Sequence, residues 1–183
     1  RMIEASSAGR HRFPARLLHW AVALVLPIQF LLGWLSEGVP GQQAGFFLLR
    51  LHYQLGMLLV LLMVLRLAWR FARGTRGVRA GASAWRRRLV ACVHGALYAL
   101  MFLLPISGYV IWVWMQAPMD VFGWFDLPRV FVAPADDETG RALAWYLHIG
   151  CGWILIGLTL GHVVAAIWHP KARGSGLRGR PAP

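Results

Sequence analysis

The chain has 183 residues, of which 58% are hydrophobic and only 14% are charged, whereas a soluble domain usually carries about 25% charged residues. This composition excludes an ordinary soluble domain and favours a membrane protein. The formal net charge of +12 would suit a nucleic-acid binder, but the basic residues form blocks between long uncharged runs, which argues against a nucleic-acid partner.

Four stretches lack charged residues: 17–36, 51–65, 89–119 and 142–170. A helix needs about 20 apolar residues to cross a membrane, and the second stretch reaches that length by extending into its apolar flanks. Helices are expected because they satisfy their own backbone polar groups in hydrocarbon. The first run follows a basic start, as in a signal peptide. It is long enough to span and shows no clear cleavage site, so we interpret it as a retained helix.

We therefore expect an all-α membrane protein, a four-transmembrane-helix bundle forming one domain over residues 1–183. The expected helices cover about residues 14–36, 46–71, 87–116 and 142–169. Most basic residues lie in the two terminal tails and in the loop between the second and third helices. The positive-inside rule then predicts that both termini are cytoplasmic. We expect a multi-pass protein of the bacterial cytoplasmic (inner) membrane, in contact with its lipids.

The loop between the third and fourth helices, at residues 116–141, is the longest on the expected outer side. It carries Trp124 and Phe125, followed by an acidic run that ends at Glu138. The sequence leaves three interpretations open: a short amphipathic cap, a docking surface, or a solvated loop.

Histidines within the apolar runs are the main functional signal, because an ionisable residue inside a membrane is costly to bury. His148 and His162 are fourteen residues apart, so they share one helix face and lie about 21 Å apart along its axis. His52 lies near the outer start of the second helix, and His19 near the inner start of the first. This predicts two cross-helix pairs, His52 with His148 and His19 with His162.

Two imidazoles at one depth on facing helices suit the two axial positions of a haem iron. A zinc site would favour clustered ligands, and a c-type haem would need a Cys-x-x-Cys-His motif, which is absent. The expected cofactors are therefore two non-covalent b haems. Gly56, Gly152 and Gly161 are near the ligands and could admit the macrocycle, although helix packing explains each one equally well.

Two features fit less simply. On a count of about 1.5 Å per residue, His19 is roughly 8–9 Å nearer its charge boundary than His162. His94 lies at the inner depth without an evident partner, and a quinone, proton or propionate role competes with a structural hydrogen bond. Arg66 and Arg70 lie on one helix face. Arg66 is a candidate propionate contact, while lipid headgroups are the alternative partners of both arginines.

The sequence resembles the prokaryotic cytochrome b561 family over nearly its whole length. The segments that carry the resemblance are RLLHW at 16–20, LHYQLG at 51–56, RLAWR at 66–70, His94 with LPISG at 104–108, and the fourteen-residue spacing of the last pair. The resemblance implies iron ligation by His19, His52, His148 and His162. It also implies residence in the cytoplasmic membrane and electron exchange with ubiquinone.

The best-known small members resemble a superoxide oxidase. This favours a superoxide:ubiquinone oxidoreductase that takes electrons from superoxide at the outer face and reduces ubiquinone in the membrane. Arg50, Arg129 and Arg141 could attract the anion, or be ordinary interfacial arginines. The alternative is a cytochrome b subunit that passes electrons between a periplasmic redox partner or dehydrogenase and the quinone pool. A haem-free protein with structural histidines is the third interpretation.

Overall fold

The computed structural model describes residues 12–73, 83–134 and 136–174. These residues form four long helices and one small hairpin. The elements are α2 (Arg12–Gly38), α3 (Gln42–Arg73), α4 (Ala84–Met115), β1 (Asp120–Val121), β2 (Phe125–Asp126) and α5 (Glu138–Gly174).

All four helices are long and apolar enough to cross a membrane, which confirms the predicted all-α membrane fold. Leu24, Leu61, Ile106 and Ile154, one on each helix, are exposed. Apolar surface of this extent belongs in lipid. Each helix begins two to four residues before the predicted start. The prediction followed the apolar residues, whereas backbone hydrogen bonds let a helix continue through polar and charged residues beyond the hydrocarbon.

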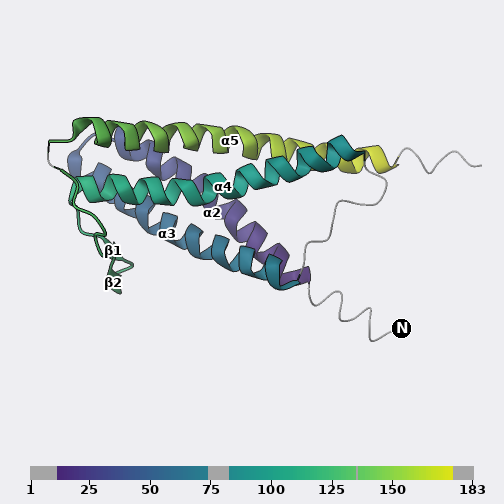
Figure 1. Ribbon diagram of the computed structural model, residues 1–183, viewed down its shortest axis with the longest axis horizontal. Coiled ribbons are helices and arrows are strands. Elements are labelled where there is room, and N and C mark those ends of the chain that lie inside the picture. Colours follow the sequence, from purple (N-terminus) through teal and green to yellow (C-terminus); the bar gives the residue numbers. More distant parts are fainter. Residues whose placement is uncertain (1–11, 74–82, 135, 175–183) are drawn as a thin grey trace, which may run out of the picture.

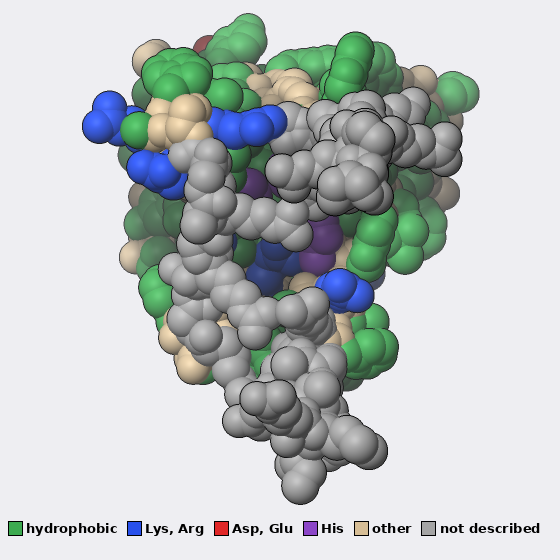
Figure 2. All heavy atoms as spheres, turned by 90° about the vertical axis from the view of Figure 1, so that its right-hand side faces the viewer, with side chains coloured by type: hydrophobic (Ala, Val, Ile, Leu, Met, Phe, Trp, Pro, Cys, Tyr) green, Lys and Arg blue, Asp and Glu red, His purple; other side chains and the backbone are tan. Residues whose placement is uncertain are grey.

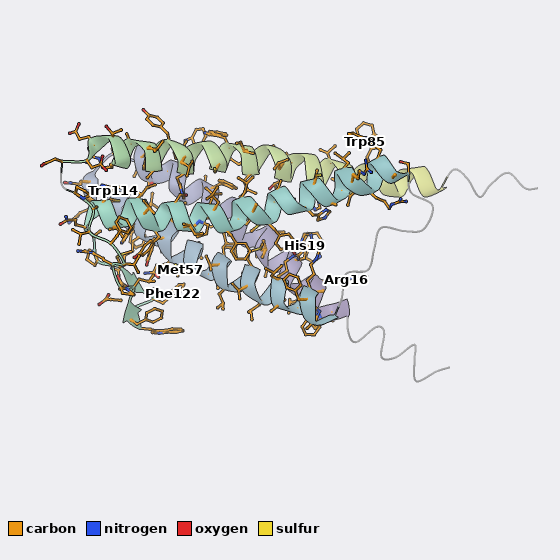
Figure 3. The ribbon with its side chains drawn as sticks, viewed as in Figure 1. Arg16, His19, Met57, Trp85, Trp114 and Phe122 are labelled. Carbon is orange, nitrogen blue, oxygen red and sulfur yellow. The ribbon has the colours of Figure 1, made fainter. Side chains whose placement is uncertain are left out.

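The helices associate as two antiparallel pairs (Figure 1), with α2 packed mainly on α3 and α4 mainly on α5. Helix α2 begins, and α5 ends, at one end of the bundle, which we call the terminal end. The hairpin lies at the opposite end, which we call the hairpin end. Figure 3 shows His19 and Trp85 toward the terminal end, and Trp114 and Phe122 toward the hairpin end.

Two buried clusters hold the bundle together. The first joins α2, α3 and α5 through Val22, Leu26, Leu59, Met63 and Leu155. The second lies at the hairpin end, where Trp112 and Val113 of α4 meet Met119 and Ala133 of the following loop. The two pairs of helices therefore pack on each other at the middle and at the hairpin end.

The loop after α4 is more ordered than a solvated loop. Strands β1 and β2 pair antiparallel, with Asp120 opposite Asp126. Gln54 of α3 is buried and binds the hairpin twice: its Nε2 donates to the Asp120 carbonyl at 2.7 Å, and its Oε1 accepts from the Phe122 amide at 2.8 Å. The Arg50–Asp120 ion pair, at 2.8 Å, adds a third link.

Candidate functional site

The hairpin-end pair consists of His52 on α3 and His148 on α5. Their ring centroids lie 6.1 Å apart, with the ring planes at 74°. The two side chains come from different helix pairs and face each other between them.

The imidazole of His52 is fixed by a neighbouring backbone group. Its Nδ1 lies 2.9 Å from the carbonyl oxygen of Gln29 on α2. A carbonyl can only accept a hydrogen bond, so Nδ1 carries the proton and Nε2 keeps a free lone pair. The Gln29 side chain returns the contact, since its Nε2 donates to the His52 carbonyl at 2.7 Å. Metal-binding histidines commonly have their second ring nitrogen bonded in this way.

His148 has the same arrangement with a side chain as partner. Its Nδ1 lies 2.9 Å from the hydroxyl oxygen of Ser107 on α4, and that hydroxyl donates its own proton to the Leu104 carbonyl at 2.9 Å. A serine hydroxyl has only one proton, so it accepts from His148 Nδ1. Nε2 of His148 is therefore also free to bind a metal.

Two glycines on neighbouring helices let these rings approach. A Cβ placed on Gly33 would lie 3.0 Å from the His52 ring, and a Cβ on Gly108 would lie 3.2 Å from that of His148. The glycines predicted from the sequence do not adjoin the rings. A Cβ on Gly56 would meet Gln29, a Cβ on Gly152 would meet Phe30, and a Cβ on Gly161 would meet none of the described residues within 4 Å. Those three glycines lie on α3 and α5, the helices that carry His52 and His148, whereas the close contacts to these two rings come from α2 and α4.

The terminal-end pair consists of His19 on α2 and His162 on α5. Their ring centroids lie 6.4 Å apart, with the planes at 89°. The offset in depth counted from the sequence does not keep the rings apart. Helix α2 begins at Arg12, before the charge boundary used for that count, so distance from the first apolar residue is a poor measure of depth.

His94 has a neighbour, contrary to the expectation from the sequence. Its ring centroid lies 5.3 Å from that of His162, at 88°, and its Nδ1 donates to the Val90 carbonyl at 2.7 Å. The sequence placed it at the correct depth, but whether α4 turns it toward α5 depends on helix rotation. The terminal end thus brings together three imidazoles, those of His19, His94 and His162.

Arg66 lies beside this cluster. Its Nε donates to the Tyr98 hydroxyl at 3.0 Å, and its Nη1 is buried with no hydrogen-bond partner among the described residues. Arg70 instead lies over the Tyr98 ring at 5.7 Å. Figure 2 looks onto this end and shows histidine and basic side chains recessed between hydrophobic walls.

The ring separations suit a metal held between two imidazoles. A metal–imidazole bond of about 2 Å, with about 1 Å from nitrogen to ring centre, puts the centroids of two opposed ligands about 6 Å apart. The His52–His148 and His19–His162 pairs meet this distance, and the His94–His162 pair is shorter. No group of three or more His, Cys, Asp or Glu side chains within the described ranges could hold a metal ion. Haem iron needs only two ligands from the protein, and the unpartnered Arg66 nitrogen suits an anionic group such as a propionate.

The fold and the histidines define a multi-pass membrane protein with paired imidazoles between its helices. The profile of the family described as prokaryotic cytochrome b561 matches residues 10–178, and the chain belongs to this family. Its members are membrane electron-transfer proteins that bind haem b.

Two proteins of Escherichia coli strain K12 are similar to the chain. Cytochrome b561 homolog 2 is 31% identical over 152 residues, which cover 82% of this chain and 79% of that protein. Cytochrome b561 homolog 1 is 26% identical over 159 residues, which cover 83% of this chain and 85% of that protein. The similarity extends across the helices rather than being confined to one motif.

Proposed function

We propose that the chain binds two b haems and carries electrons between the two ends of the bundle. His52 and His148 would hold one haem, and His19 and His162 the other. The observation that carries this proposal is that α5 presents two histidines fourteen residues apart, each facing an imidazole of the opposite helix pair. One ligand pair serves each end.

Each bound haem supplies a one-electron iron couple, and the residues of the chain set its surroundings. The Gln29 carbonyl and Ser107 hold the two hairpin-end imidazoles with Nε2 free. Arg66 offers a buried cationic N–H at the terminal end, which would bind a propionate and favour iron reduction there. All four proposed ligand imidazoles are partly buried between the helices.

We place the terminal end in the cytoplasm of a bacterium whose inner membrane holds the protein. The basic residues Arg66, Arg70, Arg86, Arg87 and Arg88 gather at the helix ends on that side, as the positive-inside rule requires. Ubiquinone is the proposed acceptor within the membrane. His94, beside His162, is the candidate group to bind the quinone or pass a proton.

The proposed donor at the hairpin end is superoxide, which makes the protein a superoxide:ubiquinone oxidoreductase. Arg50 lies at this end and is exposed, but Asp120 meets its charge at 2.8 Å. Freeing Arg50 should therefore speed capture of an anion. Stopped-flow mixing with superoxide tests this. Superoxide should reduce the haem of the Asp120→Asn variant faster than that of the wild type, and the difference in rate should shrink as salt is added.

Asp126→Asn is the matched control, because Asp126 lies opposite Asp120 in the hairpin and the substitution removes the same charge. Equal rates of haem reduction in the two variants would show that Arg50 does not help to capture the donor. Slow, salt-insensitive reduction of the wild type would argue against superoxide as donor.

A second candidate donor is a periplasmic redox protein, which would make the chain an electron-transfer subunit. The hairpin-end segments carry Arg50, Arg129 and Arg141 against six acidic residues, and the exposed Trp124 and Phe125 extend from the same surface. This excess of acidic residues would suit a basic protein partner. Cross-linking from residue 124 in membranes would capture such a partner, and recovery of uncross-linked protein alone would count against it.

A further inference from the structure

Ser107 stands out because it is a buried hydroxyl in a membrane helix that contacts a proposed haem ligand. Its side chain is 4% exposed, and its Oγ lies 2.9 Å from both the Leu104 carbonyl and His148 Nδ1. Serine in a membrane helix often donates to the carbonyl one turn back and needs no other partner. The contact to His148 goes beyond that local role.

We propose that Ser107 is a positioning residue that fixes the orientation of the His148 ring and its strength as an iron ligand. The inference rests on the proposed ligation of a haem by His52 and His148. Helix α4 supplies neither of the two proposed hairpin-end ligands. One of its side chains would nevertheless influence that haem.

The assignment follows from counting protons. If the Ser107 hydroxyl donated to His148 Nδ1, the imidazole proton would be on Nε2 and that nitrogen could not bind iron. Donation to the Leu104 carbonyl directs the oxygen lone pairs at Nδ1–H, which leaves Nε2 free. Gly108, the next residue, gives the ring room to reach Ser107, because a Cβ there would lie 3.2 Å from the ring.

The two hairpin-end imidazoles differ in the kind of group that lies next to their Nδ1 atoms. His52 is held by the Gln29 backbone carbonyl, which every amino acid supplies. His148 Nδ1 faces the Ser107 hydroxyl at 2.9 Å, with the Leu104 backbone carbonyl beside it, so the identity of residue 107 decides whether the ring has a hydroxyl acceptor. An acceptor on Nδ1–H makes an imidazole a stronger electron donor and stabilises oxidised iron. Loss of the hydroxyl should therefore raise the reduction potential of the hairpin-end haem.

Potentiometric titration of the purified full-length protein tests the proposal, with the hairpin-end component identified as the one that His52→Ala removes. Ser107→Ala should shift that component to higher potential and broaden its low-spin ferric resonance in electron paramagnetic spectra. Ser107→Thr, which retains a hydroxyl, should restore both. Ser36→Ala is the control, because Ser36 makes the same type of bond, to the Gly33 carbonyl at 2.8 Å, without contacting a histidine through its hydroxyl.

Loss of the hairpin-end haem from Ser107→Ala, with retention in Ser107→Thr and Ser36→Ala, would also support the role. An unchanged potential and resonance in Ser107→Ala would overturn it, as would equal haem loss from the alanine and threonine variants. A failure of the proposed function would give a different result: the wild type would then lack a redox component that depends on His52.

Discussion

Arg66 donates from Nε to the Tyr98 hydroxyl at 3.0 Å, while its Nη1 is buried without a hydrogen-bond partner among the described residues. Tyr98 thus holds the guanidinium in place and leaves one side of it for an anion. A buried N–H without a partner costs about 1–3 kcal/mol, so a bound propionate would remove a real penalty.

Arg66→Leu should lower the reduction potential of the terminal-end haem, because a nearby positive charge favours the reduced state. At an effective dielectric of about 20 and a charge separation of about 15 Å, the lost interaction is about 1 kcal/mol, or about 40 mV for one electron. A redox titration measures it. Arg70→Leu serves as control, since Arg70 is exposed and lies over the Tyr98 ring. Equal shifts in both variants would mean that only the general charge matters.

His162 has two imidazole neighbours at the terminal end, those of His19 and His94, and substitutions can distinguish their roles. His19→Ala should abolish the terminal-end haem, because its ring lies 6.4 Å from that of His162, a separation that suits a shared metal. His94→Ala should retain both haems and slow electron transfer to quinone. Haem per chain, by the pyridine haemochrome method, checks the first point, and quinone reduction in liposomes checks the second. If His94→Ala lost the haem and His19→Ala kept it, the ligand assignment would be wrong.

Gly33→Ala should weaken haem binding at the hairpin end. The added Cβ would lie 3.0 Å from the His52 ring, and crowding of this kind costs about 1–3 kcal/mol, or roughly tenfold in retention. Transfer of haem to excess apomyoglobin measures that retention. Gly95→Ala is the control, since within the described part of the chain a Cβ there would meet nothing within 4 Å. A Gly33→Ala protein that holds haem as firmly as Gly95→Ala would show that the ring can move aside.

Gln54→Ala should loosen the hairpin without changing either ligand pair. The substitution removes the bonds to Asp120 and Phe122, at a cost of about 1–3 kcal/mol. Limited proteolysis between residues 118 and 134 should become faster, while haem content stays the same. Gln43→Ala, at an exposed position of the same helix, should be cut at the wild-type rate. Equal cutting of both variants would contradict the tethering role.

The sequence predicted the spanning helices well because charge and apolar length decide where a chain can enter hydrocarbon. It also predicted which helices carry His52 and His148, since a regular helix converts spacing into depth. It missed the partners on other helices: Gly33, Ser107 as an acceptor, and the position of His94. These contacts depend on how each helix is rotated about its axis, which periodicity does not reveal in helices apolar on most sides.

The hairpin was missed for a different reason. Its strands have two residues each, too few for an alternating pattern to appear. Their position depends on Gln54, which is distant in sequence and lies among apolar neighbours. A glutamine buried in a membrane helix was the available signal, because such a residue needs a partner.

The number of haems per chain tests the central claim most directly. We predict that reduced-minus-oxidised spectra of the purified wild type, calibrated by total iron and haem extraction, give two b haems per chain. His52→Ala and His19→Ala should each leave one haem, with different potentials. A wild type with a single haem, or with none, would contradict the assignment of two ligand pairs.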